Sequence, residues 1–486
     1  MSGAGAFADL EPAGVWERFA ELTQIARPSK GEGPAREHVL AWAARHELEA
    51  EVDTAGNVVV RVPASPGRER APIVVLQSHL DIVCERDPDS PFDPREGRIH
   101  VVREEDWIVA RGTTLGADNG IGVAAAMAVA EDPAVAHGPL ELLFTVSEEQ
   151  GLDGAKALDP SLVAGRILLN LDGTSDESLT VGCAGSAHTF VRLPLTHAPV
   201  PAGCTGLAVT LDGARGGHSG GYIARGRANA IKALGRVLAA ASSAVPIRLA
   251  SLDGGGSRNA IPREALATLV IGTGSEQAFQ DALDAELTAL REQHAAAGDS
   301  LAISIEAAGV PVAAEPTTSA RALDLVTAIP TGVIAMSPTA PGSVETSTSL
   351  NVATTEEGVL TLASMTRSAR SPALDDVVST IETAARRTGA EVEVVRSYPP
   401  WQPDPGSSLL ATARDTFTRL FELEPGLEVV HGGLECAVIG DKLPGVQMLA
   451  IGPLIEGLHA PGERLAISST QRFYSLLGAL LDDLAG

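Results

Sequence analysis

The 486-residue sequence has few cysteines and no long apolar run, and both absences limit the class of protein. Its cysteines, Cys84, Cys183, Cys204 and Cys436, are scattered and form no CxxC motif, so we expect a reduced, cytoplasmic protein without a structural zinc knuckle. No stretch of about 18 apolar residues predicts a membrane helix. The N-terminal residues lack a basic start followed by an apolar core, so we expect no secretory signal.

Basic residues are also scarce. Lys and Arg number 36 against 62 Asp and Glu, which gives a formal net charge of −26. Nucleic-acid phosphates require basic surfaces, so this charge argues against a nucleic-acid partner. Most of the acidic residues are typical of a solubility surface, and a few are candidates for neutralising bound cations.

Four short apolar runs predict the strands of an α/β domain: Ile73–Gln77, Leu140–Val146, Ile167–Leu171 and Val446–Ile451. Such runs are typical of a parallel sheet that is covered on both faces. Acidic or imidazole side chains follow each run: His79 and Asp81, then Glu148 and Glu149, then Asp172, and finally His459. Because ligands bind at the carboxyl ends of open α/β sheets, we expect these side chains to converge there.

Each of the side chains at these strand ends could bind a metal or could have a purely structural role. His79 and Asp81 point to the same side of an extended chain, and a carboxylate commonly fixes the ring of a metal-binding imidazole. Asp118 precedes an Ala-rich helix predicted from Ile121, so Asp118 or Asn119 could cap that helix. Alternatively, the Asp118 carboxylate could bridge two metals. Adjacent glutamates are usually a solvated pair, but two unpaired charges are costly at the end of a buried strand.

The chain is too long for one ordinary core, which predicts two domains. After about Gly182 the sequence changes to alternating segments, and Tyr398–Pro403 is Pro-rich and predicts a return linker. We therefore predict a first domain formed by residues 1–184 and 399–486, with residues 185–398 inserted as a second domain. No internal repeat is evident in the sequence.

Together these segments resemble the M20 family of metallopeptidases, and within it the aminoacyl-histidine dipeptidase branch, also called Xaa-His dipeptidase or peptidase D. The resemblance spans nearly the whole chain and is carried by the order and spacing of ARPSK (from Ala26), SHLDIV, TTLGADNGIG, SEEQG, LDGT, GGHSGG, SRNAIPRE, HGGLECAVIG and LHAPGE. It implies an α/β catalytic domain of the zinc-peptidase type, with a mixed, mostly parallel sheet flanked by helices. It also implies that the inserted segment is an α+β lid and dimerisation domain.

The resemblance further implies two Zn²⁺ ions per subunit, for which Co²⁺ or Mn²⁺ are possible substitutes. The implied ligands are His79, Asp118, Glu149, Asp172 and His459. Asp118 would bridge the two ions, His79 and Asp172 would complete the ligands of one ion, and Glu149 and His459 would complete those of the other. Asp81 would hold His79, and Glu148 would act as the general base.

The resemblance assigns substrate contacts mainly to the inserted domain. His218 would help to hold the oxyanion of the tetrahedral intermediate. Asn259 and Arg367 would grip the substrate, with Arg370 as an alternative to Arg367 for the terminal carboxylate. In the segment that begins at His431, His431 and Glu435 would line the substrate side, and Glu435 would meet a free amine.

The leading functional hypothesis is therefore a cytoplasmic di-zinc dipeptidase that acts on unblocked dipeptides and prefers a C-terminal His. A second hypothesis is another reaction of the same family, such as tripeptide aminopeptidase or N-acyl amino acid deacylase activity. A third is a peptide-binding protein without turnover, against which the presence of both glutamates and all five ligands argues. The expected partners are a small peptide substrate and a second copy of the chain, with no nucleic acid or membrane.

Overall fold

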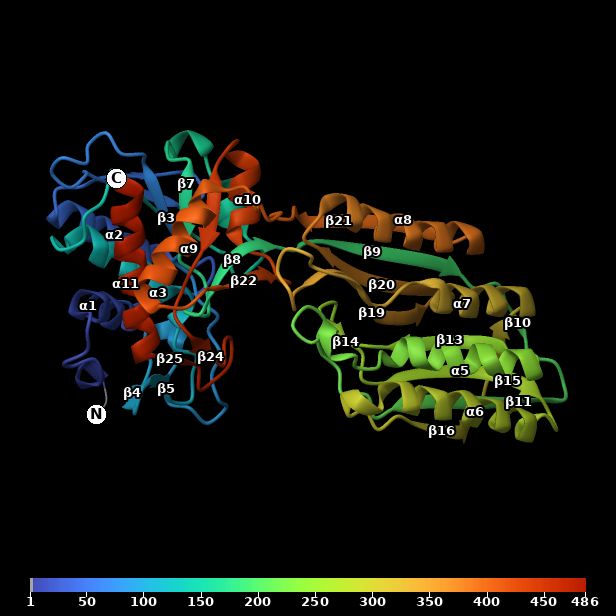
Figure 1. Cartoon of the computed structure of the whole chain (residues 1–486). Helices are drawn as coiled ribbons and strands as arrows, with labels where there is room; N and C mark the ends of the chain where they lie inside the picture. Colours follow the sequence, from blue (N-terminus) through green and yellow to red (C-terminus); the bar gives the residue numbers. More distant parts are fainter. Residues whose placement is uncertain (1–2) are drawn as a thin grey trace. The chain divides into compact units, whose positions relative to one another are not determined.

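The computed structural model describes residues 3–486 and divides the chain into two compact units (Figure 1). Unit 1 comprises Met1–Gly182, Trp401–Glu428 and Leu434–Gly486, of which Met1 and Ser2 lie outside the described residues. Unit 2 comprises Cys183–Pro400 and Val429–Gly433. The short Val429–Gly433 segment belongs to unit 2 although the predicted boundaries assigned it to the first domain. One reason is that His431 Nε2 lies 2.7 Å from Ser347 Oγ of unit 2.

Unit 1 is built on an eight-stranded sheet in the order β1-β2-β6-β3-β7-β23-β8-β22. Its central strands β6, β3, β7 and β23 are parallel, whereas β1, β2 and β8 pair in antiparallel fashion on either side. All residues of β3 and β6 are buried, as expected for central strands that are covered on both faces. The predicted α/β class is confirmed, with a sheet that is parallel at its centre.

The strands of this sheet are β1 (Glu49–Val52), β2 (Val58–Val62), β3 (Val74–His79), β6 (Leu140–Thr145), β7 (Ile167–Asn170), β8 (Ser178–Cys183), β22 (Gly426–Val430) and β23 (Gln447–Ala450). A second sheet of unit 1 contains β4 (Val101–Glu104), β5 (Trp107–Ala110), β24 (Ile455–Glu456) and β25 (Arg464–Ala466). The helices of unit 1 are α1 (Ala13–Leu22), α2 (Gly33–Arg45), α3 (Ala117–Glu131), α4 (Asp153–Ala157), α9 (Ser408–Phe421), α10 (Glu435–Lys442) and α11 (Ile467–Ala485).

Unit 2 contains two nested copies of a β-α-β-β-α-β motif. One copy runs β11-α5-β13-β15-α6-β16, and it is inserted between β9 and α7 of the other, which runs β9-α7-β19-β20-α8-β21. Their strands form one sheet in the order β16-β11-β15-β13-β19-β20-β9-β21, so the two halves mirror each other about the β13–β19 pair. β18 adds a further strand beside β19. This topological repeat is not evident in the sequence.

The strands of unit 2 are β9 (Gly185–Pro194), β10 (His197–Pro199), β11 (Cys204–Asp212), β12 (Gly217–His218), β13 (Arg248–Gly254), β14 (Ala260–Ile261), β15 (Ala265–Gly272), β16 (Ala302–Ala307), β17 (Val312–Ala314), β18 (Gly332–Met336), β19 (Val344–Glu356), β20 (Val359–Ser368) and β21 (Glu391–Tyr398). Its helices are α5 (Ala230–Ala244), α6 (Glu276–His294), α7 (Pro316–Ala328) and α8 (Ser371–Thr388).

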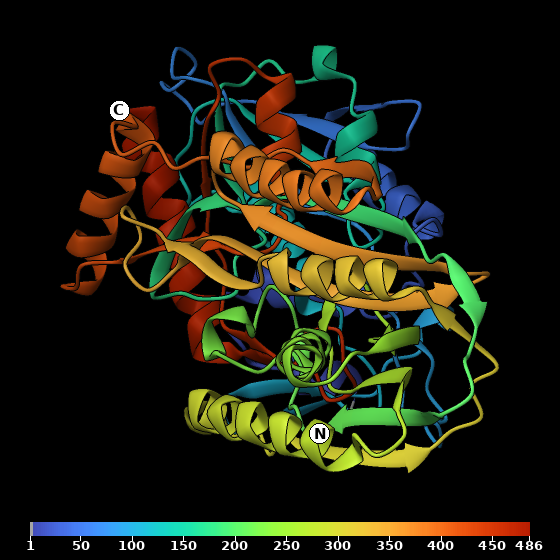
Figure 2. The same cartoon turned by 90° about the vertical axis from the view of Figure 1, so that its right-hand side faces the viewer.

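One continuous apolar core holds unit 2 together. It joins the buried faces of α5, α6, α7 and α8 to alternate residues of the strands, such as Val191 and Leu193 of β9, so the four helices cover one face of the sheet (Figure 2). Among the helices of residues 3–486, none combines the length and apolar character that a bilayer crossing requires.

Candidate metal centre

The candidate site of unit 1 lies where its central parallel strands end. β6, β3 and β7 are neighbours in the sheet, so the residues that follow them emerge at one edge. His79 is the last residue of β3, Glu148 and Glu149 follow β6, and Asp172 follows β7. Asp118 lies in the first turn of α3, and His459 lies between β24 and β25.

The ligand-type atoms of these residues form two groups that share Asp118. In the first, His79 Nε2 lies 2.9 Å from Asp118 Oδ1 and 3.6 Å from Asp172 Oδ1. In the second, His459 Nε2 lies 3.2 Å from Asp118 Oδ2 and 3.2 Å from Glu149 Oε1. Within each group one atom per residue lies within 4.8 Å of the others. Asp118 thus presents one carboxylate oxygen to each histidine.

The donor set of this cluster fits divalent cations. Each group offers one imidazole nitrogen and two carboxylate oxygens, which zinc and similar ions accept. Glu149 Oε1 is buried and makes no hydrogen bond, because its contact with His459 lacks hydrogen-bond geometry. A buried carboxylate oxygen without a donor is costly, and an ion would satisfy it. The five residues therefore form a possible metal-binding cluster.

The electrostatics of the cluster favour positive charge. A hydrogen bond to Asp118 and the nearby negative charge of Glu149 raise the pKa of His459 to about 11. Burial lowers the pKa of His79, but Asp172, Asp118 and Asp81 outweigh burial and raise this pKa well above its ordinary value. Burial and the Asp118 charge raise the pKa of Asp172 to about 7. Each imidazole therefore lies in a negative field that a divalent cation would neutralise.

Asp81 is a buried carboxylate that contacts several residues of the cluster. Its Oδ1 lies 3.4 Å from His79 Nδ1, and its Oδ2 accepts a 2.7 Å hydrogen bond from the Ser29 hydroxyl. Its two oxygens also accept the backbone N–H groups of Glu148 and Glu149, at 2.9 and 3.2 Å. Burial alone would raise the pKa of Asp81, but these partners lower it to about 2, so the residue is a permanent anion. His79 Nδ1 also lies 3.0 Å from the Asp81 backbone carbonyl, so the carbonyl and the carboxylate of Asp81 together orient the imidazole.

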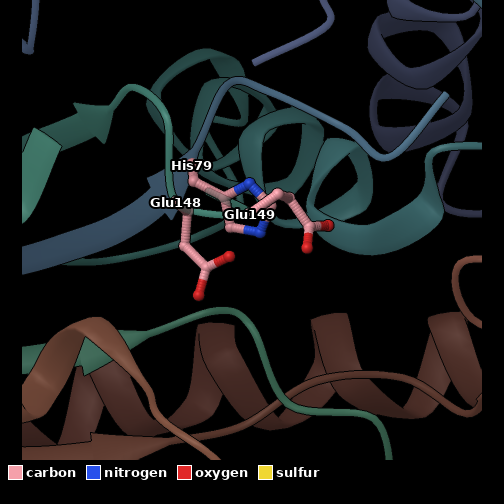
Figure 3. A group of neighbouring side chains, drawn as sticks. All are labelled: His79, Glu148 and Glu149. Atoms are coloured by element: carbon pink, nitrogen blue, oxygen red, sulfur yellow. The ribbon is translucent and has the colours of Figure 1, made fainter. Parts of the chain in front are cut away.

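The two adjacent glutamates have different surroundings. Figure 3 shows the carboxylates of Glu148 and Glu149 on different sides of the His79 imidazole, and one ligand-type atom of each of these three residues lies within 4.8 Å of the others. His459 forms its ion pair with Glu149 and not with Glu148. Burial raises the pKa of Glu148 well above the ordinary value, and the charges of Asp172 and Glu149 raise it further. A carboxyl group with a raised pKa beside a cation site can accept and return a proton near neutral pH. The pair is therefore not a solvated surface pair.

The alternative that Asp118 or Asn119 caps α3 is wrong. Asp118 and Asn119 have non-helical backbone angles and form a kink before the continuous part of α3, but neither side chain accepts a backbone N–H of this helix among the described residues. Asn119 instead donates to the Leu171 carbonyl at 2.8 Å and to Asp172 Oδ1 at 2.9 Å. Asn119 thereby holds Asp172 beside Asp118.

The sequence analysis assigned no role to two buried residues that support the site. Glu463 accepts the backbone N–H groups at the start of α3, and Arg27 donates to the carbonyls of Leu80 and Gly116. Both residues lie in segments that carry the family resemblance, ARPSK and LHAPGE. A sequence pattern does not reveal such contacts, because the partners are backbone atoms far away in the chain.

Four of the predicted substrate-binding residues lie in unit 2. His218 Nδ1 accepts the backbone N–H groups of Gly220 and Gly221 at 3.2 and 3.1 Å, so Nε2 carries the proton of the neutral ring. Ser219 N donates to the Asn259 carbonyl at 2.7 Å, which places Asn259 next to this turn. Burial and the charges of Arg367 and His218 influence His431, whose pKa falls to about 4.

Arg367 and Arg370 differ in burial and in partners. Arg367 is buried in β20, its Nη1 lies 3.3 Å from the Tyr398 hydroxyl, and its Nε has no hydrogen-bond partner among the described residues. Arg370 is exposed and lies 3.7 Å from the Glu345 carboxylate. Of the two arginines, Arg367 is therefore the one whose guanidinium has no anion beside it in the described part of the chain.

Glu435 does not lie where a substrate amine could meet it, which corrects the prediction. The residue begins α10 in unit 1 and is 0% exposed. Its Oε2 accepts hydrogen bonds from Gln77 Nε2 at 2.5 Å and from Thr145 Oγ1 at 2.6 Å. Gln77 in turn accepts from Asn170, whose Oδ1 accepts the Asp172 backbone N–H. Glu435 therefore belongs to a buried hydrogen-bond network that supports the backbone of Asp172.

Comparisons with known proteins agree with this geometry. The model of peptidase family M20/M25/M40 matches residues 75–483. The chain is 37% identical over 476 residues to the cytosol non-specific dipeptidase of Escherichia coli strain K12, an alignment that covers 98% of both chains. The crystal structure of an aminoacylhistidine dipeptidase from Vibrio alginolyticus matches with a TM-score of 0.90 and 34% identity, over 98% of this chain and 97% of that one.

The fold is also similar to that of a more distant structure. An aminopeptidase PepT from Bacillus cereus matches with a TM-score of 0.57 and 16% identity over 98% of this chain and all of that chain (100%), a similarity of fold alone. The family match covers most of the sequence and includes every residue of the metal-type cluster. The chain therefore belongs to peptidase family M20/M25/M40 and is a hydrolase.

Proposed function

We propose that the protein is a cytoplasmic dipeptidase that uses two divalent cations, with Zn²⁺ as the native ion, to hydrolyse unblocked dipeptides. The observation that carries the proposal is the sharing of Asp118, which offers one oxygen to the His79 group and the other to the His459 group. Such sharing is the arrangement expected of a bridging carboxylate in a two-metal site. His79 and Asp172 would hold one ion, and Glu149 and His459 the other.

Two cations bound there would supply Lewis-acid chemistry, lowering the pKa of a water and polarising the scissile carbonyl. The residues of the chain perform the proton transfers. Glu148 takes a proton from the water as its oxygen bonds to the carbonyl carbon, and returns that proton to the amide nitrogen as the C–N bond breaks. The products are a free amine and a carboxylate. The raised pKa of Glu148 supports this role, because the group must hold a proton between the two steps.

We further propose that unit 2 serves as a lid domain whose residues His218, Asn259, Arg367 and His431 bind substrate. The fixed tautomer of His218 supports its role, since a neutral ring that carries its proton on Nε2 is a ready donor for an oxyanion. Within residues 3–486 the buried guanidinium of Arg367 has no anionic partner, which suits the terminal carboxylate of a dipeptide. The proposed preference for a C-terminal His is supported by one relative, the aminoacylhistidine dipeptidase of Vibrio alginolyticus, whereas the relative from Escherichia coli is a non-specific dipeptidase.

The decisive experiment measures hydrolysis of dipeptides, a tripeptide and an N-acyl amino acid by the purified chain, with and without Zn²⁺. We expect dipeptides to be cleaved, Xaa-His substrates fastest, and chelation to abolish the reaction. Preferred cleavage of the tripeptide or the acyl amino acid would replace the dipeptidase proposal with one of the alternative reactions. Cation binding without any turnover would indicate a peptide-binding protein.

We also propose a homodimer. Val333, Ile334 and Met336 of β18 are exposed apolar side chains on unit 2, and β18 pairs with a strand on one side, β19. A second copy would cover such a surface. Light scattering after size exclusion should give twice the 50.0 kDa mass of one chain, and a monomer mass would refute this part of the proposal.

A further inference from the structure

A short backbone segment that leads to Asp118 is held from both sides by buried charged residues. The segment is Leu115–Ala117, and the residues are Glu463, from near the C-terminus, and Arg27, from near the N-terminus. Among the residues that the structure describes, neither Glu463 nor Arg27 forms a hydrogen bond or ion pair with a side chain of the proposed metal ligands. Both contact the same residue, since Gly116 donates its N–H to Glu463 and its carbonyl accepts a hydrogen bond from Arg27.

Glu463 accepts the backbone N–H groups of the short segment that precedes the kink of α3 at Asp118 and Asn119. Its carboxylate is 2% exposed, and it accepts the N–H of Leu115 at 2.8 Å, of Gly116 at 3.1 Å and of Ala117 at 2.8 Å. The N–H of Asp118 lies at 3.5 Å. The first N–H groups of a helix lack partners within it, and an Asp in the first turn commonly supplies one. The Asp118 carboxylate accepts none of these N–H groups, and its two oxygens face His79 and His459.

Arg27 holds the other side of the segment. Its guanidinium is 1% exposed and donates through Nη2 to the Gly116 carbonyl at 2.7 Å and through Nη1 to the Leu80 carbonyl at 3.0 Å. Leu80 lies between His79 and Asp81 in the chain. Two glycines leave room for the guanidinium, because a Cβ on Gly116 or Gly120 would lie 2.9 or 2.4 Å from Nη2.

These contacts join three separate parts of the site. Glu463 belongs to the same loop as His459 and is anchored there, since its carbonyl accepts the Ala110 N–H at 3.1 Å. Arg27 connects the segment of Asp118 to the end of β3, which carries His79. Asp118 contacts both histidines, so a small movement of its backbone would change both ion sites together.

We propose that Glu463 and Arg27 are positioning residues that hold the Leu115–Ala117 backbone and thereby set the distances from Asp118 to His79 and His459. The inference rests on the proposed function, because it concerns the affinity of that site for divalent cations. Side chains that orient metal ligands from behind typically contribute about 10- to 100-fold to metal affinity.

The test compares Glu463→Gln with Glu141→Gln in the full chain. Glu141 is a matched control because it is also buried and accepts backbone N–H groups, those of Ala164 and Gly165, but it lies at the opposite end of β6. Zn²⁺ affinity and stoichiometry are measured by competition with a chromophoric chelator. We expect Zn²⁺ to bind about 10- to 100-fold more weakly to Glu463→Gln and within about twofold of the parent to Glu141→Gln.

A second pair of variants covers the case in which Glu463→Gln does not fold. Arg27→Met removes both contacts, whereas Arg27→Lys keeps the charge and can retain one, so we expect the loss of Zn²⁺ affinity to be larger for Arg27→Met. Equal Zn²⁺ affinity in the parent and all folded variants would overturn the inference and leave the proposed function intact. An equal loss in Glu141→Gln would also overturn it. A parent protein that binds no Zn²⁺ would overturn the proposed function, and the inference with it.

Discussion

Asp81 Oδ1 accepts the backbone N–H of Glu148 at 2.9 Å, which ties the acid that faces His79 to the residue proposed as general base. The same carboxylate accepts the N–H of Glu149 through its other oxygen. The buried Asp81 carboxylate therefore holds the backbone of both glutamates in place. From this backbone the two side chains extend to different sides of the His79 imidazole (Figure 3). Glu149 contacts His459, whereas Glu148 stays outside both groups that share Asp118.

The first prediction separates proton transfer from cation binding. Glu148→Gln should retain both cations and lose at least about 10²-fold in kcat, because the amide cannot take a proton from water. His459→Ala should lose cations first, since it removes a nitrogen donor from the group that contains Glu149. Metal analysis and steady-state kinetics of both variants provide the measurement. Full activity of Glu148→Gln would contradict the mechanism.

The second prediction concerns the oxyanion donor. His218→Ala should lower kcat by about 10²- to 10³-fold, the typical cost of removing one preplaced donor. Metal content should not change, because His218 lies in unit 2 and the metal-type cluster lies in unit 1. His294→Ala is the matched control, as this exposed histidine of the same unit contacts the Gly226 carbonyl. Similar losses of kcat in both variants would argue against a specific role for His218.

The third prediction distinguishes the two arginines. Arg367→Met should raise KM for dipeptides by about 10- to 100-fold, as expected for the loss of a charged hydrogen bond of about 1.5–3 kcal/mol. Arg370→Met should have little effect on KM, because Arg370 is exposed and already faces Glu345. Kinetics with a dipeptide and its C-terminal amide give the readout. If the Arg370 variant, and not the Arg367 variant, lost its preference for the free dipeptide over the amide, Arg370 would be the residue that binds the terminal carboxylate.

The fourth prediction tests the burial of Glu435. Burial raises the pKa of Glu435 to about 7, so the folded state binds the extra proton. Its stabilising contribution is present below the ordinary value of 4.5 and is lost as the pH rises through 7. Glu435→Gln keeps an oxygen for Gln77 and Thr145, and should therefore be at least as stable as the parent at pH 8.

The matched variant for this site is Glu435→Ala, which leaves the donors of Gln77 and Thr145 unpaired. We expect it to lower the free energy of unfolding by about 1–3 kcal/mol at any pH. Urea unfolding at pH 5.5 and pH 8 measures both effects. KM for dipeptides should stay within about twofold in Glu435→Gln, since a charged hydrogen bond to a substrate amine would be worth about 1.5–3 kcal/mol. A large rise in KM would restore the predicted amine contact.

The fifth prediction is a pH dependence from His431. Burial and the charge of Arg367 lower its pKa from 6.5 to about 4, so the unfolded chain binds more protons between these values. Unfolding free energy should therefore fall as the pH drops from 6.5 to 4, by at most about 3 kcal/mol from this residue. His431→Gln should become more stable relative to the parent over this range. A constant difference between the two proteins would contradict the buried, neutral imidazole.

Local sequence patterns predicted many elements of the fold. The apolar run Leu140–Val146 predicts a strand, and β6 spans Leu140–Thr145. The apolar run Ile167–Leu171 predicts a strand, and β7 spans Ile167–Asn170. These elements could be predicted because their apolar pattern depends on which faces are buried, and that information is local. The placement of acidic and imidazole side chains after buried strands also follows from local order, together with the rule that such strand ends meet.

The sequence by itself determined which residue types stand at the ends of the buried strands, and therefore that a cation site is possible there. Only the tertiary structure decided that Glu435 is buried, that Glu463 accepts the backbone N–H groups just before Asp118, and that unit 2 is a nested repeat. The physical reason is that these features depend on contacts between distant parts of the chain. Gln77 and Glu435 or Leu115 and Glu463 are separated by hundreds of residues, and no periodicity records which backbone N–H a carboxylate will meet.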